Sequence, residues 1–463
     1  MKTKKVLKIT PILITLNLLV LFTIVGFYTA RLIKYYLLEN GETADTTVYL
    51  VDEIKKKRSY LDETKGLVYK EDTDEYVYKG EVNDNYLSYS GLIYRILGID
   101  KNGNIKAVSE HNVTLIYPGF DKGYKDSYVN KWLNFQEGVK YSGKFEEALV
   151  NSKSLLVNNL YCSDVIDDVS NITCDEETED YKITLLSLYD YKESGGKSGF
   201  LNNGDSYNLG TLSKDNLNYF VTEEGEITIH TRKTTPITLK PVITIANTTE
   251  LISGNGKEDS PYVIEEHEIS ILADTDIGNY VKAGDITFRV VEKYEDKIRL
   301  ITDDILYEGE DKPLEIAFGG SNNRYTTSNK VGSYLNNDFL KDFKFKDDIV
   351  LSNFYTGMMS LDDLDYSTIR SDFVEAKVGL PSIGDLFIND TYNILTTLRG
   401  VEESKLINVI NSKGIFFADE ITSEYNVKAI LSLRYDLVIE SGDGSEESPF
   451  ILGVSNEGKE KEE

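Results

Sequence analysis

The chain has 463 residues, of which 40% are hydrophobic and 11% aromatic, so it has the composition of a folded protein of two or three domains rather than a disordered one. Its formal net charge is −28, and its first 38 residues carry basic groups but no acid, so the remainder is more acidic still. A field of this sign repels phosphate backbones, which argues against nucleic acid as a partner.

The amino terminus contains one long apolar segment. Residues 9–30 carry no charge, and a helix of that length spans roughly the 30 Å hydrocarbon core of a membrane. The sequence predicts a transmembrane signal anchor there, after a basic cytoplasmic segment at 1–8, with the bulk of the chain outside the cell. A cleaved signal peptide is the competing interpretation, but its apolar region is usually shorter. Residues 31–74 are predicted to form a stalk, and the polar tail 455–463 is predicted to be disordered.

A twelve-residue motif occurs twice: SGNGKEDSPYVI at 253–264 returns as SGDGSEESPFIL at 441–452. The segments NYLSYSGLIYRILGI (85–99) and NYVKAGDITFRVVEK (279–293) also match, and their apolar and polar residues alternate as in half-buried strands. The motif therefore ends each of two tandem, divergent units.

These units predict the fold class. SYVNKWLN (127–134) and NKVGSYLN (329–336) align, with apolar residues at the spacing of a short helix packed on a sheet. We therefore predict α+β as the class, with the transmembrane helix followed by two β-rich, loop-rich domains at 75–265 and 266–454.

The motifs resemble an uncharacterised tandem-repeat domain, a domain of unknown function found in exported, membrane-anchored proteins of low-GC Gram-positive bacteria. The first unit matches at YRILGI (94–99), WLN (132–134), FLNNGDSYNLGT (200–211), LKPVITI (239–245) and SGNGKEDSPY (253–262). The second unit keeps FRVV, YLN and SGDGSEESPF but has no clear Leu-Asn-Asn-Gly loop. Lys240 and Lys428 replace the usual Arg of the family. The resemblance implies a compact α+β fold on the cell surface and no settled activity.

The repeated motif allows two interpretations. SGNG and SGDG supply the residues of a tight turn, and we favour a turn that joins the last strand of each unit to an edge strand. The alternative is a calcium site made of Asn255, Glu258 and Asp259 in the first copy of the motif, or of their counterparts Asp443, Glu446 and Glu447 in the second. No other cofactor is expected.

The loop GFLNNGDSYN of the first unit is the candidate ligand-binding surface. Its side chains Asn202, Asn203, Asp205 and Tyr207 combine amide, carboxylate and phenol groups, which suit recognition of a glycan or a protein.

Cys162 and Cys174 are too far apart for a redox CxxC motif and too few for a zinc quartet. Outside the cell, we expect them to form a disulfide, and two thiols are the alternative.

No recognisable nucleophile, base and orienting residue occur together, and the three histidines His111, His230 and His267 lie in different contexts. We therefore predict a non-enzymatic, membrane-anchored cell-surface protein for adhesion or ligand binding. A structural spacer or envelope scaffold is the alternative, and a surface hydrolase is the third hypothesis.

Overall fold

The computed structural model describes residues 47–116, 119–120, 123–139, 142–149, 155–162, 165–170, 172–174, 177–230, 237–265, 269–309, 311–357, 373–382, 385, 394–397, 405–410 and 416–454. The described residues from 49 onward form one compact unit. The predicted membrane anchor at 9–30 and the predicted disordered tail at 455–463 lie outside the described residues. Within the ranges above, no helix is both long and apolar enough to cross a membrane.

The fold is mostly β-sheet, with 39% strand and 13% helix, so the predicted α+β class is wrong. The reason lies in the length of the helical patterns. Apolar residues at helical spacing occur only in short stretches, and the predicted helix at 127–134 is α3, which covers Tyr128–Leu133. The longer apolar stretches alternate with a period of two and form strands, such as β4 (Leu92–Ile99).

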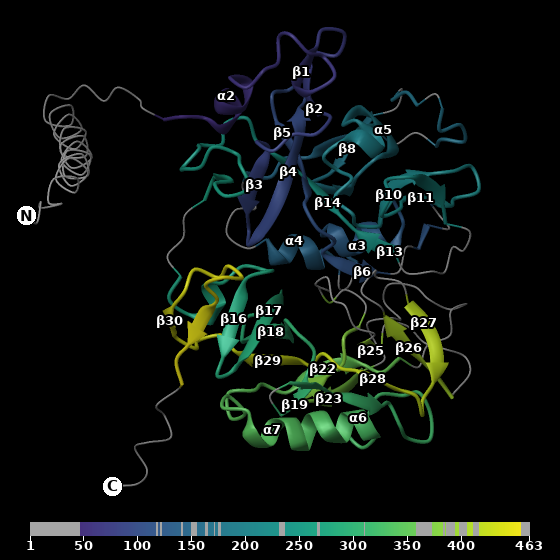
Figure 1. The fold of residues 1–463 in the computed structure, drawn as a ribbon, viewed down its shortest axis with the longest axis vertical. Helices are drawn as coiled ribbons and strands as arrows, with labels where there is room; N and C mark the ends of the chain where they lie inside the picture. Colours follow the sequence, from purple (N-terminus) through teal and green to yellow (C-terminus); the bar gives the residue numbers. More distant parts are fainter. Residues whose placement is uncertain are drawn as a thin grey trace, which may run out of the picture. The chain divides into compact units, whose positions relative to one another are not determined.

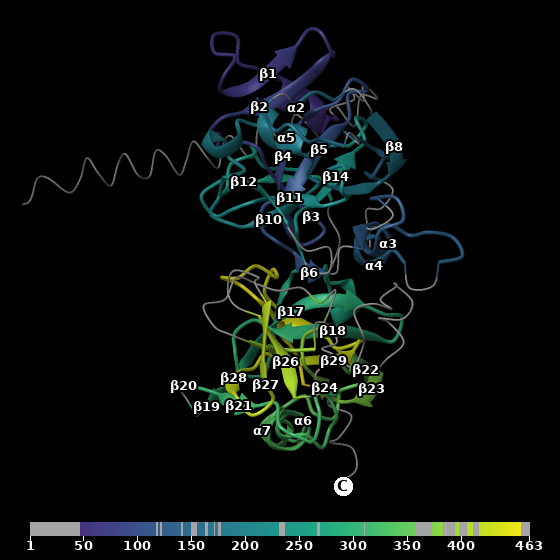
Figure 2. The same cartoon turned by 90° about the vertical axis from the view of Figure 1, so that its right-hand side faces the viewer.

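Two sheets are built from residues 66–263, which are purple to teal in Figures 1 and 2. The larger sheet has the order β1-β2-β4-β5-β14-β9, with β3 beside β4 and β15 beside β3. Its strands are β1 (Gly66–Lys70), β2 (Glu75–Lys79), β3 (Tyr86–Tyr89), β4, β5 (Ile105–Ser109), β9 (Ile183–Leu185), β14 (Pro241–Ile245) and β15 (Tyr262–Val263). The smaller sheet has the order β12-β11-β10-β13-β6. Its strands are β6 (Thr114–Ile116), β10 (Tyr207–Leu212), β11 (Asn218–Val221), β12 (Ile227–Ile229) and β13 (Ile237–Leu239).

The remaining elements of this part are short. They are the hairpin of β7 (Asn159–Cys162) and β8 (Glu177–Tyr181), and the helices α2 (Leu50–Lys55), α4 (Lys144–Ala148), α5 (Leu188–Glu193) and η3 (Gly196–Ser198).

Residues 280–452, green to yellow in Figure 1, form a further seven-stranded sheet of the order β24-β29-β18-β17-β16-β31-β30. Its strands are β16 (Tyr280–Ala283), β17 (Ile286–Lys293), β18 (Lys297–Thr302), β24 (Val378–Gly379), β29 (Ile430–Arg434), β30 (Ile439–Ser441) and β31 (Phe450–Leu452). A five-stranded sheet has the order β21-β28-β25-β26-β27. Its strands are β21 (Glu315–Ala317), β25 (Ile394–Thr396), β26 (Leu406–Ile410), β27 (Phe416–Glu420) and β28 (Glu424–Asn426).

The other elements that the structure describes here are two small hairpins and four short helices. They are β19 (Tyr307–Glu308) with β20 (Lys312–Pro313), β22 (Ser352–Tyr355) with β23 (Phe373–Ala376), η4 (Leu272–Asp274), α6 (Lys330–Ser333), the π-helix η5 (Tyr334–Asp338) and α7 (Phe339–Asp342).

The same strand order occurs twice along the chain. The path β15-β3-β4-β5-β14-β9 corresponds to β31-β16-β17-β18-β29-β24, and β12-β11-β10-β13-β6 corresponds to β27-β26-β25-β28-β21. Even the irregularities correspond, because both β4 and β17 shift register against the next strand two residues after the central arginine, Arg95 or Arg289. A shared strand order with shared bulges explains why the same sequence motifs recur.

The twelve-residue motif makes a tight turn before the last strand of each path. Gly254 and Gly442 have positive φ, and a Cβ on them would lie 1.8 Å from the carbonyl oxygen of Pro261 and 2.1 Å from that of Pro449. Only glycine fits at so close an approach. The strand that follows, β15 or β31, then pairs in parallel with β3 or β16.

The structure differs from the predicted stalk at 31–74 over its described part. Leu50 and Ile54 of α2 are fully buried, and β1 pairs with β2 along its whole length. β2 in turn pairs with the end of β4 through Tyr76 and Val77. The sequence did not predict this packing, because the apolar residues beside the charged run at α2 are few and widely spaced.

Candidate ligand-binding pocket

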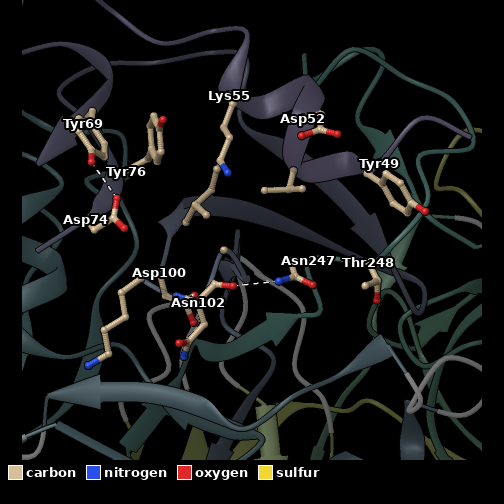
Figure 3. Close-up of a pocket in the computed structure, with 14 residues that line it drawn as sticks. Tyr49, Asp52, Lys55, Tyr69, Asp74, Tyr76, Asp100, Asn102, Asn247 and Thr248 are labelled. Carbon is tan, nitrogen blue, oxygen red and sulfur yellow. Dashed lines mark hydrogen bonds between the residues drawn. The ribbon is translucent and has the colours of Figure 1, made fainter. Parts of the chain in front are cut away.

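A cavity of about 530 Å³ lies between α2, the β1–β2 hairpin, the turn after β4 and the segment after β14 (Figure 3). We call it the tyrosine pocket because three of its lining residues are Tyr49, Tyr69 and Tyr76. In Figure 3, Tyr69 and Tyr76 lie at one end of the cavity, and Tyr49 lies at the other beside Thr248. Its volume is in the range of small-molecule sites.

The hairpin fixes the first pair of aromatic rings. Tyr69 and Tyr76 are cross-strand partners in β1 and β2, and their ring centroids are 4.9 Å apart. The Tyr69 hydroxyl donates a 2.8 Å hydrogen bond to Asp74 in the hairpin turn. This hydrogen bond raises the pKa of Tyr69 and fixes the orientation of its ring. Tyr76 also receives the ammonium of Lys55 over its face, 5.7 Å from the ring centroid.

The opposite wall is a turn that is stabilised by its own hydrogen bonds. Asp100 accepts 2.8 Å hydrogen bonds from the backbone N–H groups of Asn102 and Asn104. Asn247 donates from its side chain to the Asn102 carbonyl at 2.9 Å, which links the turn to the end of β14. The wall is therefore ordered by local hydrogen bonds before any ligand arrives.

One face of α2 supplies charged side chains to the pocket. Asp52 and Lys55 are exposed and three residues apart, and Figure 3 shows Lys55 pointing into the cavity. Within the described part of the chain, the Asp52 carboxylate has no hydrogen-bond or ion-pair partner. The pocket thus offers one acceptor and one donor beside aromatic faces.

The pocket depends on Gly98 of β4. A Cβ at this position would lie 2.0 Å from the carbonyl oxygen of Tyr76, so glycine is needed for β2 to pair there. The equivalent position in β17, three residues after the matching arginine, is Glu292. Moreover, only residues 264–279 separate β15 from β16, which is shorter than the stretch 49–79 that carries α2 and the hairpin. The pocket therefore belongs to the first strand path alone.

The predicted ligand loop instead surrounds a buried lysine. Asn203 and Asp205 contact the ammonium of Lys240 through oxygens 3.1 and 3.2 Å away, and Lys240 is only 2% exposed. Tyr207 is 1% exposed, lies under the same ammonium at 4.4 Å, and donates to the Leu201 carbonyl. The amide, carboxylate and phenol groups that the sequence analysis predicted to bind a ligand therefore contact Lys240 or the backbone of their own loop.

The other members of that loop region have similar structural contacts. The Asn202 amide donates to the Lys197 carbonyl at 2.9 Å, and His111 bonds Asp205 at 3.3 Å. Burial alone would raise the pKa of Asp205, but the hydrogen bond from His111 and the charge of Lys240 outweigh it and hold the pKa well below its usual range.

The six calcium candidates do not assemble a metal site in the described residues, where no group of three or more potential ligands occurs. Asn255 and Asp443 occupy the same place in the two turns, and each side-chain oxygen accepts from the backbone N–H two residues later. Glu446 accepts a 3.3 Å hydrogen bond from Tyr280, and Glu258 and Asp259 are exposed. These contacts support the turn interpretation for this motif. Glu447 is exposed as well.

Cys162 and Cys174 are not joined by a disulfide in the structure, which departs from our expectation for the pair. Cys162 is buried at the end of β7, and Cys174 is partly exposed ahead of β8.

Sequence reasoning missed the tyrosine pocket because its walls come from four separated segments. Two of them, around Asp52 and Tyr69, fall in the predicted stalk. The one available signal was the Asn102–Gly103 turn, whose glycine has a positive φ.

The chain matches no family model, and no curated protein or solved structure is significantly similar to it. The resemblance to an uncharacterised repeat domain therefore stays a prediction.

Proposed function

We propose that this chain is a non-enzymatic binding protein that holds a neutral saccharide in the tyrosine pocket. The observation that carries the proposal is the combination, in one cavity of about 530 Å³, of tyrosine rings with the exposed Asp52 carboxylate and the exposed Lys55 ammonium. A sugar ring presents C–H groups that pack on an aromatic face, and hydroxyls that both donate and accept hydrogen bonds.

The charges of the pocket favour a neutral ligand. Three aspartates and two lysines line it, and the chain as a whole is strongly acidic. An anionic glycan would approach against the field of the protein, whereas a neutral one would not. Purely apolar ligands fit less well, since Val51 and Ile99 are the only aliphatic side chains in the described lining.

A binding role fits the pocket better than hydrolysis. Glycoside hydrolysis usually needs two carboxyl groups, one as acid and one as base or nucleophile. Asp74 accepts a hydrogen bond from Tyr69 through Oδ1, and Asp100 accepts from its own turn, so both of these lining carboxylates already have structural contacts. The described lining also contains no histidine, cysteine or serine. We propose that the site serves adhesion or ligand capture outside the cell, a location supported by the sequence only.

The test is binding of the purified full-length chain to a panel of immobilised neutral, amino and anionic saccharides and of peptides. We expect saturable binding to a neutral saccharide. Changing Tyr76 to Ala should weaken it by about tenfold or more, because a ring that packs on the ligand is lost. Asp52→Asn should weaken it through loss of the acceptor charge.

The matched controls are Tyr435→Ala and Asp72→Asn. Tyr435 is 42% exposed and Asp72 is exposed, and neither lines the pocket. If a folded sample binds nothing on the panel, the result would contradict the proposal and favour a spacer or scaffold role. Peptide binding that depends on Tyr76 would keep the site but overturn the ligand class.

A further inference from the structure

A second, smaller cavity, of about 60 Å³, is lined by both cysteines of the chain. Cys162 is the last residue of β7, and its cross-strand partner in β8 is Glu177. Cys174 lies three residues before Glu177. The Cys162 sulfur lies 3.9 Å from the carbonyl oxygen of Thr173. Since Thr173 directly precedes Cys174, the Cα atom of Cys174 is within about 7 Å of that sulfur.

Both cysteines line one small cavity, and the residue before Cys174 contacts the Cys162 sulfur. The Cα atoms of bonded cysteines are usually about 4.4–6.8 Å apart, so a disulfide would form here once the segment at Cys174 moves toward Cys162. The bond would close the chain between β7 and β8, which are already paired. No strand of the larger sheet would have to move.

The two thiols differ in access to solvent. Cys162 is 7% exposed, whereas Cys174 has intermediate exposure. A dissolved reagent therefore reaches Cys174 more readily than Cys162, and the buried Cys162 is better placed to react with a group already bound at Cys174.

We propose that Cys162 and Cys174 form a thiol–disulfide exchange pair, in which Cys174 attacks small-molecule disulfides and Cys162 resolves the mixed disulfide. In the first step, the Cys174 thiolate attacks one sulfur of a disulfide such as oxidised glutathione. The S–S bond of the reagent breaks, and one glutathione thiolate leaves.

In the second step, the Cys162 thiolate attacks the Cys174 sulfur of the mixed disulfide, and the second glutathione thiolate leaves. The chain is oxidised by two electrons, and the reagent is reduced by the same two electrons. The two protons released from the cysteine thiols are taken up by the departing glutathione thiolates.

The experiment uses the full-length chain, fully reduced and then treated with oxidised glutathione, followed by intact-mass and peptide-mass analysis. The wild type should lose the mass of two hydrogens and retain no glutathione. Cys162→Ser should accumulate one glutathione on Cys174, because the resolving thiol is missing. Cys174→Ser is the matched control and should be modified at least about tenfold more slowly, because Cys162 is buried.

Three outcomes would overturn the proposal: glutathione retained on the wild type with no internal bond, disulfide-linked dimers as the main product, or Cys174→Ser reacting as fast as Cys162→Ser. If either serine variant fails to fold, peptide mapping of the wild type at early times decides the order. Glutathione found first on Cys162 would then contradict it, and glutathione found first on Cys174 supports it.

Discussion

The Asp205 carboxylate lies 3.2 Å from the Lys240 ammonium, and the two side chains are 10% and 2% exposed. Lys240 also donates to the Glu110 carbonyl at 2.8 Å. A lysine so deeply buried is stable only while these partners remain. Lys428, just before β29, is the equivalent of Lys240 in the second strand path. It is 1% exposed and donates a hydrogen bond to the Asp303 carbonyl.

Removing the charge of Asp205 should destabilise the fold. We expect Asp205→Asn to lower the free energy of unfolding by about 3 kcal/mol at neutral pH, because the buried Lys240 charge loses its hydrogen-bonded counter-ion. Urea titration measures this. Asp285→Asn is the control, since Asp285 pairs with Lys344 at the surface and should cost less than about 1 kcal/mol. Equal costs at the two positions would contradict the buried pair.

The same pair makes stability depend on pH in a defined direction. The folded-state pKa of Asp205 is lowered, so at acidic pH the unfolded chain binds a proton that the folded chain does not. The contribution of Asp205 to the free energy of unfolding is therefore fully present above the unfolded-state pKa of about 3.9, and it is lost as the pH falls below that value. Unfolding measured from about pH 6 to pH 3 should show a steeper loss for wild type than for Asp205→Asn. Parallel curves would contradict this assignment.

Substitution of Gly98 should detach the hairpin that forms the tyrosine pocket. In Gly98→Val the new side chain meets the Tyr76 carbonyl, and we expect a cost of about 2 kcal/mol or local loss of the β2–β4 pairing. Hydrogen exchange of the backbone amides at 66–79 should rise. Ile93→Ala changes an exposed residue of the same strand and should leave that exchange unchanged. Unchanged protection in Gly98→Val would show that the close approach is not needed.

Replacing the glycine in either of the two turns should destabilise the fold by a similar amount. Gly254→Ala and Gly442→Ala each add strain at positive φ and a Cβ that overlaps a carbonyl oxygen, so we expect each to cost about 3 kcal/mol. Gly204 also has positive φ, but nothing lies within 4 Å of its Cβ position. Gly204→Ala should therefore cost only about 1 kcal/mol. Thermal unfolding of the three variants separates strain from overlap, and similar costs for all three would disprove the overlap.

Two asparagines should have matching effects in the two strand paths. Asn134 accepts from the Ile183 N–H at 3.0 Å, and Asn336 accepts from the Val378 N–H at 3.1 Å. Replacing either one by Ala should cost about 2 kcal/mol, because buried backbone groups lose their partner. The exposed Asn337 is the control, and its replacement by Ala should have little effect. A loss at one asparagine but not at the other would show that the two positions are not equivalent.

The sequence predicted local features better than the class. The alternation in LIYRILGI and ITFRVVE predicted strands, and β4 and β17 confirm them. The glycines of the twelve-residue motif predicted a turn, because positive φ and close approach leave a direct mark on the sequence. The α+β class failed because a helix as short as α3 carries the same spacing as the start of a longer one.

The candidate site shows what a sequence conceals. Asn203, Asp205 and Tyr207 have the composition of a binding loop, yet they satisfy the buried Lys240. Polar residues that surround a buried charge look the same in sequence as polar residues that await a ligand. The tyrosine pocket was hidden for a different reason, because residues near 50, 70, 100 and 247 meet only through strand pairing.

The most direct test is calorimetric titration of the full-length chain with the saccharide that the panel identifies, compared among wild type, Tyr76→Ala and Tyr435→Ala. We predict one site per chain in wild type and Tyr435→Ala, because the hairpin that completes the pocket occurs once among the described strands. Tyr76→Ala should lose most of the binding heat. Two equal sites per chain, or full binding in Tyr76→Ala, would contradict a single saccharide site in the tyrosine pocket.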